Sequence, residues 1–168
     1  MRRGLAIGLG FGLLGAAAIA AVAQGLLKED PEAAAPAEIA GLSLLGEPVT
    51  ADMVEQGGAI YAESCAACHG AQLEGQPDWR RRTEDGRMPA PPHDESGHTW
   101  HHADRDLFTI TKRGVGAIVP GYESDMPAFE DLLSDDEIKA VLAYIKTSWS
   151  ERAREFQARV SAEAEGTP

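Results

Sequence analysis

The stretch that decides the fold is Cys65-Ala66-Ala67-Cys68-His69. A C-x-x-C-H run is the attachment signature of a c-type haem. Two intervening residues let both thiols reach the vinyl groups of one porphyrin, and the histidine that follows lies under the iron, where an imidazole is a common ligand. The motif predicts one covalently attached haem c, bound through Cys65 and Cys68, with His69 as an iron ligand.

The two cysteines are the only ones in the chain, which allows the alternatives to be weighed quickly. A disulfide between Cys65 and Cys68 would close a very short loop and constrain little. A thioredoxin-like redox pair needs a βαβ setting, and no strand pattern lies nearby. A zinc site needs about four ligands, usually from two such pairs. The pattern therefore favours haem.

The charge of the chain is strongly asymmetric. All 27 acidic residues lie beyond position 28, and Arg2 and Arg3 are the only charged residues ahead of the first apolar run. The remaining 13 basic residues face those 27 acidic ones. This balance argues against nucleic acid and against docking on anionic lipid. It suits a soluble body whose charge can steer encounters with basic patches on partner proteins.

Residues 1–27 form a segment of their own, with two basic residues followed by an apolar run from Gly4 to Leu27. Its first interpretation is a secretory signal peptide cut after Ala23, since Ala21-Val22-Ala23 is an A-x-A site. Its second, slightly favoured, is an uncleaved anchor, because about 20 apolar residues span a bilayer as a helix. Under both interpretations the body of the protein is exported from the cytoplasm.

We therefore expect the body on the periplasmic side of the bacterial inner membrane, held by an N-terminal hydrophobic helix, because basic residues before an apolar segment keep that end in the cytoplasm. The alternative is a soluble periplasmic protein after cleavage near Ala23. Residues 28–49 follow, rich in Ala, Pro and Glu and without an apolar period. We interpret them as a linker, partly extended.

From Thr50 the pattern becomes helical. Thr50 can cap a helix that begins at Ala51, and residues 54, 57, 61 and 65 then fall on one face that leads to the haem motif. Gly57 is costly inside a helix, so its expected benefit is the close approach of another helix. A long irregular region follows, residues 75–100, which we expect to wrap the haem edge.

Two more helices precede the last segment. Residues 104–113 predict a short helix ended by Gly114. Ser134-Asp135-Asp136-Glu137 is a capping box that opens the clearest helix, whose apolar stripe runs from Ile138 to Trp149. Tyr144 lies beside this stripe and could pack on Gly57. Residues 150–168 are charged and helix-prone, and we expect a helical C-terminal extension.

With these motifs in order, the chain resembles class I cytochromes c over about residues 50–149. The matching features are Gly57 and Tyr61, then Cys65-Ala66-Ala67-Cys68-His69-Gly70, Pro91-Pro92, Asp125-Met126-Pro127-Ala128-Phe129, and Leu133 to Glu137 leading to Val141-Leu142-Ala143-Tyr144-Ile145. The resemblance implies an all-α cytochrome c fold, with three or four helices around one haem. It also implies one-electron transfer, and a methionine sulfur as sixth iron ligand, which is Met126 in this chain.

The residues themselves leave more than one candidate for that ligand. Met88 and Met126 both lie beside proline in irregular chain, and a thioether suits haem iron. Met126 is favoured because Pro127 stiffens the chain after it and because it precedes the last helix. A histidine is a third candidate. A metal-bound histidine usually donates its other ring N–H to a carbonyl; similar proteins use a proline carbonyl, here that of Pro91 or Pro92.

Four of the five histidines, His93, His98, His101 and His102, lie within ten residues. One hypothesis is a second metal site for copper or zinc, since imidazole suits both. The more ordinary one is that these side chains bind haem propionates or the loop backbone, since histidine clusters are often only compositional.

The leading functional hypothesis is a one-electron carrier in a respiratory or related chain, whose redox partner is a membrane oxidoreductase or a terminal oxidase. We do not expect an enzyme, because ligation by His69 and Met126 leaves no open position on the iron. One alternative is a haem enzyme, or a cytochrome that reacts with gas or peroxide once its methionine dissociates. Another is the haem subunit of a membrane oxidoreductase, docked through the extension past Trp149.

Overall fold

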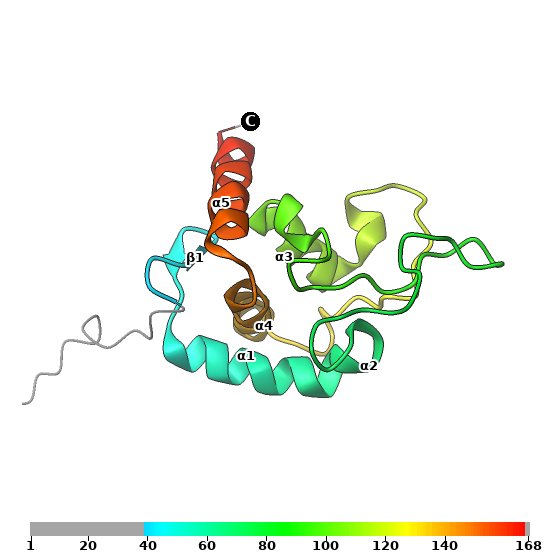
Figure 1. Cartoon of the computed structure of the whole chain (residues 1–168), viewed down its shortest axis with the longest axis horizontal. Coiled ribbons are helices and arrows are strands. Elements are labelled where there is room, and N and C mark those ends of the chain that lie inside the picture. Colours follow the sequence, from blue (N-terminus) through cyan, green and yellow to red (C-terminus); the bar gives the residue numbers. More distant parts are fainter. Residues whose placement is uncertain (1–38, 167–168) are drawn as a thin grey trace, which may run out of the picture. The chain divides into compact units, whose positions relative to one another are not determined.

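The computed structural model describes residues 39–166 (Figure 1). Five helices follow one another in this part of the chain: α1 Ala51–Ser64, α2 Ala66–His69, α3 Asp104–Arg113, α4 Asp135–Thr147 and α5 Glu151–Glu165. Short 3₁₀ turns occupy Thr99–His101 and Val115–Ala117, and two strands of two residues, β1 Ser43–Leu44 and β2 Glu47–Pro48, pair antiparallel. The expected all-α fold class is confirmed.

The predicted signal or anchor segment and the first part of the predicted linker lie outside the described residues. Within residues 39–166, no helix combines the length and the apolar character that crossing a bilayer requires.

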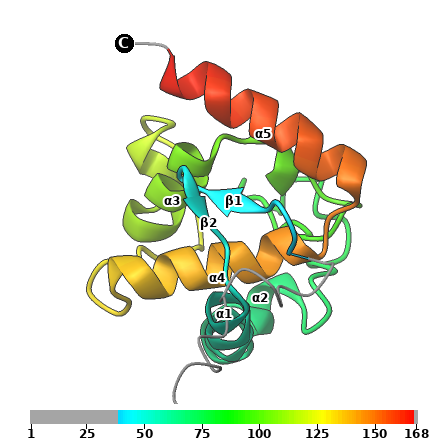
Figure 2. The same cartoon turned by 90° about the vertical axis from the view of Figure 1, so that its left-hand side faces the viewer.

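The fold is built on the crossing of α1 and α4, with α1 nearly end-on to the viewer below α4 in Figure 2. Thr50 caps α1, since its side chain accepts a hydrogen bond from the backbone N–H of Met53. Gly57 is buried where the helices meet, and a Cβ built there would lie 2.0 Å from the carbonyl oxygen of Ala140 and 2.9 Å from the Cβ of Tyr144. The expected contact of Gly57 with Tyr144 is confirmed.

The apolar stripe of α4 forms the centre of the core. Ser134 and Glu137 form the predicted capping box. The stripe is buried along α4 at Ile138, Val141, Leu142 and Ile145, and Trp149, which the sequence placed on the same helix, is buried just past its end at Thr147. α3 has the predicted bounds, and Gly114, at φ 81°, ends it. α3 and α4 therefore both turn apolar side chains toward the interior of the domain.

The linker prediction for residues 28–49 is wrong over its last eleven residues. Ile39, Leu42, Leu44 and Val49 are buried in the core. The strands of this hairpin are joined by Leu45 and Gly46, both at positive φ (52° and 78°), which is the geometry of a tight I′ turn. The apolar positions are too few for a visible period, so the composition alone concealed a folded segment.

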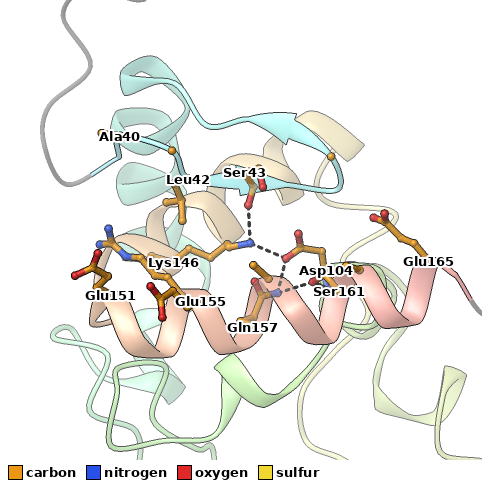
Figure 3. A pocket seen from close by; sticks show the side chains of 15 residues that line it. Ala40, Leu42, Ser43, Asp104, Lys146, Glu151, Glu155, Gln157, Ser161 and Glu165 are labelled. Atoms are coloured by element: carbon orange, nitrogen blue, oxygen red, sulfur yellow. Dashed lines mark hydrogen bonds and ion pairs between the residues drawn. The ribbon is translucent and has the colours of Figure 1, made fainter.

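α5 is attached through a buried polar cluster (Figure 3). Lys146 Nζ donates to Asp104 Oδ1 at 2.8 Å and to the Ser43 carbonyl at 2.6 Å. Gln157 Nε2, on α5, donates to the same Asp104 oxygen at 2.6 Å, and Ser161 Oγ accepts from the Asp104 backbone N–H at 3.0 Å. One carboxylate therefore joins the hairpin segment, α3, α4 and α5.

Candidate haem site

The helix geometry places the cysteine motif at the end of α1. The N–H of Cys65 donates to the Tyr61 carbonyl, and the short helix α2 then carries Cys68 and His69 to Gly70, which leaves it at φ 83°. Tyr61 Oη donates to the Gly70 carbonyl at 2.8 Å and ties the last turn of α1 to the residue that follows the motif. Burial first, and Cys68 second, raise the pKa of the Cys65 thiol to about 11.

Both thiols and His69 line a cavity of about 490 Å³. The walls come mainly from α2, α3, α4 and the loops before and after α3. Their apolar members include Leu107, Ile110, Val115, Phe129, Val141, Leu142 and Ile145. Figure 1 shows the green loop after α2 and the yellow segment before α4 side by side, and Arg87 of the first forms an ion pair with Asp125 of the second. The two segments close one side of the cavity.

The cavity fits a haem. Its volume lies in the range of cofactor pockets, about 300–1,000 Å³. Its lining offers two thiols at the attachment spacing, one oriented imidazole, thioethers and an apolar surround, which is the donor set of a His/Met-ligated haem c. Cys65, Cys68 and His69 are brought together as expected from the sequence.

His69 is buried, and its Nδ1 lies 2.9 Å from the Pro91 carbonyl oxygen. A carbonyl only accepts, so Nδ1 carries the proton and Nε2 is the nitrogen left for iron. Burial lowers the pKa of His69, and the hydrogen bond to Pro91 partly offsets that shift, so the ring stays neutral as a metal ligand must. Of the two candidate prolines, Pro91 therefore supplies the carbonyl that orients His69.

Met88 and Met126 both line the cavity. The backbone N–H of Met126 donates to Ser124 Oγ at 3.1 Å, a local turn that shapes the chain around the thioether. Met126 as the sixth ligand stays a prediction, and Met88 is the side chain to compare with it.

The four clustered histidines make different contacts, although His98 and His102 also meet edge to face with ring centroids 5.4 Å apart. His93 stacks on His69, with ring centroids 4.0 Å apart, and its Nδ1 pairs with Thr99 Oγ1. His98 stacks on Trp79. His102 lines the cavity, and His101 packs on Trp100. In the described part of the chain no group of three or more His, Cys, Asp or Glu could hold a metal ion, so the structure gives the second metal site no support.

Sequence reasoning named His93 only as a member of the histidine cluster and missed its packing against the imidazole of His69. It missed Trp79 altogether, which lines the cavity and stacks on His98. The signal that could have identified His93 is its place immediately after Pro91-Pro92, since the chain that supplies the carbonyl to His69 must pass close to that ring.

Comparison of the sequence with known proteins agrees with a haem site. A family model described as cytochrome c matches residues 54–149, more than half of the sequence, and the chain belongs to the cytochrome c family. A nitrite reductase of Stutzerimonas stutzeri is 34% identical over 122 residues, which cover 64% of this chain and 20% of that protein. The chain therefore spans about a fifth of the length of this relative. No solved structure gives a significant match.

Family and site together define a c-type cytochrome. It binds covalently attached haem c, Cys65 and Cys68 fit the attachment motif, and the cytochrome c domain serves haem-based electron transfer.

Proposed function

We propose that the protein is a monohaem one-electron carrier whose iron is bound by His69 and Met126. The observation that carries the proposal is the meeting, in one apolar cavity, of the two thiols, the carbonyl-bonded His69 ring and the Met126 thioether. The bound haem supplies a ferric/ferrous couple, and Met/His ligation raises its potential. The chain attaches it, orients His69 and excludes water with the walls of α3 and α4.

A carrier is favoured over an enzyme because ligation by both His69 and Met126 would leave the iron no open position for a substrate. The walls around them are apolar side chains of the core, which leave little polar surface for a substrate. The acidic balance of the sequence supports basic redox partners, such as a membrane oxidoreductase or a terminal oxidase.

The proposed place of action is the periplasmic side of the bacterial inner membrane. The support is the apolar run of residues 4–27 behind Arg2 and Arg3. Retention of the run would tether the haem domain to the membrane, and cleavage after Ala23 would release it. Intact mass of the exported protein separates the two forms.

A second candidate function is that of a haem subunit in an oxidoreductase. The observation that favours it is the match to a fifth of a nitrite reductase, which shows that a related sequence occurs as part of an enzyme. Because Ala153 and Gln157 of α5 are buried, deleting the extension would also disturb the core. Docking through α5 is therefore better tested by reversing the charge of Arg152 and Glu155, which are exposed.

The deciding experiment compares Met126→Leu with Met88→Leu in the full-length, haem-loaded protein. Loss of the near-infrared ferric methionine band and a fall of the reduction potential in Met126→Leu, with both unchanged in Met88→Leu, support the proposal. The reverse pattern assigns Met88. A wild-type protein without the band, whose reduced form binds carbon monoxide at once, favours the gas- or peroxide-reactive alternative and overturns the carrier.

A further inference from the structure

The chain that orients His69 depends on contacts made by its neighbours. Pro91 and Pro92 have no backbone N–H, so this pair cannot fix itself through its own donors. The pair is instead held at its ends: the Ala90 N–H donates to Gln76 Oε1 at 2.8 Å, and the His93 N–H donates to the Leu73 carbonyl at 2.8 Å. We call residues 90–94 the proline strap.

The backbones of two glycines from the same loop lie directly against the strap. A Cβ built on Gly75 would lie 2.4 Å from the Pro92 nitrogen, and one built on Gly97 would lie 2.0 Å from the Pro92 carbonyl oxygen. Pro92 itself is among the most deeply buried side chains. The strap is therefore confined between two backbones, and a small displacement along its length is transmitted to the neighbouring Pro91 carbonyl.

The strap is also anchored from far along the sequence. Trp149 Nε1 donates to the His93 carbonyl at 2.8 Å across 56 positions. Trp149 lies in the turn between α4 and α5 and is 2% exposed. Ser150, which caps α5, adds a hydrogen bond from its Oγ to Glu95 Oε1 at 2.6 Å. The turn between α4 and α5 is thus hydrogen-bonded to the chain just after Pro91.

From these contacts we propose that Trp149 is a positioning residue for the proximal ligand, acting on His69 through the His93 carbonyl and the proline strap. The hydrogen bond from His69 Nδ1 to Pro91 raises the basicity of the imidazole toward iron. A more basic imidazole favours the ferric state, so the indole of Trp149 lowers the reduction potential by keeping that hydrogen bond short. The inference rests on His69 binding iron, as in the proposed function.

The test is Trp149→Phe in the full-length, haem-loaded protein, with Trp100→Phe as the matched control. Phenylalanine keeps an aromatic ring and removes the indole donor. In Trp100 the indole also donates to a loop carbonyl, that of Glu95 at 3.3 Å, but it does not bond the strap. We expect Trp149→Phe to raise the potential, with a shift of the ferric–ferrous equilibrium of up to about tenfold, or about 59 mV for one electron.

The control Trp100→Phe should keep the wild-type potential. The second readout is the resonance of the His69 Nδ1 proton in the reduced protein, which should move in Trp149→Phe and stay in place in Trp100→Phe. A loaded Trp149→Phe protein with unchanged potential and proton shift overturns the inference. Should that variant fail to load haem, hydrogen exchange of the indole N–H protons in the wild-type protein decides. A Trp149 proton that exchanges as fast as that of Trp100 would show that Trp149 does not anchor the strap, and the inference would be overturned.

Failure of this inference is distinguishable from failure of the proposed function. A wild-type spectrum without histidine and methionine ligation contradicts the carrier, whereas an intact spectrum with an unmoved potential in Trp149→Phe contradicts the role of Trp149 alone.

Discussion

The backbone of Gly57 on α1 lies so close to the carbonyl of Ala140 on α4 that no side chain fits between them; a Cβ would stand 2.0 Å from that oxygen. We predict that Gly57→Ala destabilises the protein by several kcal/mol, because backbone cannot move aside as a side-chain tip can, and overpacking typically costs about 1–3 kcal/mol or more. Denaturant unfolding of the haem-loaded protein measures the loss.

Gly58 is the matched control for that substitution, one position along the same helix. A Cβ there meets only the ring of Tyr144, at 3.3 Å, and alanine is about 1 kcal/mol better than glycine in a helix. Gly58→Ala should stay within about 1 kcal/mol of wild type. Equal losses in the two variants would contradict the close crossing of α1 and α4.

The carboxylate of Asp104 provides a second test, because it neutralises the buried Lys146 ammonium and also binds Gln157 of α5. Burial lowers the pKa of Lys146, and Asp104 opposes that shift. Asp104→Asn leaves the ammonium without a counter-charge and should cost about 3–5 kcal/mol of unfolding free energy. Faster proteolysis within α5 should accompany the loss.

Glu47→Gln is its control, since Glu47 is exposed and its Oε1 lies 3.5 Å from Nζ of the half-buried Lys139. An exposed pair is worth at most about 1 kcal/mol. Similar costs for the two substitutions would show that the polar cluster of Figure 3 does not hold α5 in place.

The hairpin before α1 makes a third prediction. Leu44 is 1% exposed in the core, so Leu44→Ala should cost about 2–5 kcal/mol, as in other truncations of buried leucines. Leu132 is 71% exposed, and Leu132→Ala should change stability by less than about 0.5 kcal/mol. If Leu44→Ala left the stability unchanged, the result would contradict the folded hairpin and favour the linker that the composition suggested.

The stability should also depend on pH through His98 and His102. Burial is the main cause that lowers the pKa of each ring below 6.5, and neighbouring histidines add to it. The unfolded chain therefore binds protons that the folded chain does not. Stability should be complete above about pH 6.5 and fall as the pH drops below it.

Denaturant titrations of the haem-loaded protein between about pH 8 and pH 5 measure this dependence. The lowered pKa of Glu137 lies below its ordinary 4.5, so it contributes at lower pH. Replacing both histidines by glutamine should make the profile less steep, while His93, whose pKa burial lowers well below 6.5, keeps part of the slope. An unchanged slope in that double variant would assign the whole dependence to other groups.

Local signals predicted the helices well. The bounds of α3 followed from its acidic start and from Gly114, and the start of α4 followed from its capping box. The hairpin escaped because two-residue strands leave no period to detect. The cluster around Asp104 escaped because its partners lie up to 59 positions apart and meet only in three dimensions.

The site shows the same division. The motif alone identified Cys65, Cys68 and His69, because attachment chemistry fixes their spacing. It could not choose between Pro91 and Pro92, which differ in the direction of one carbonyl. It also did not place His93 against His69, since a stacked ring depends on the path of the whole loop.

The central claim is that one haem is bonded to this chain through Cys65 and Cys68, and mass spectrometry of the denatured protein tests it most directly. The full chain is produced in a host that matures c-type cytochromes, and haem is extracted with acidified organic solvent before measurement. We predict a protein that stays red and keeps the added mass of one haem, and a Cys65→Ala/Cys68→Ala variant that loses both. A wild-type chain at its polypeptide mass alone, with all colour in the solvent, would contradict the account.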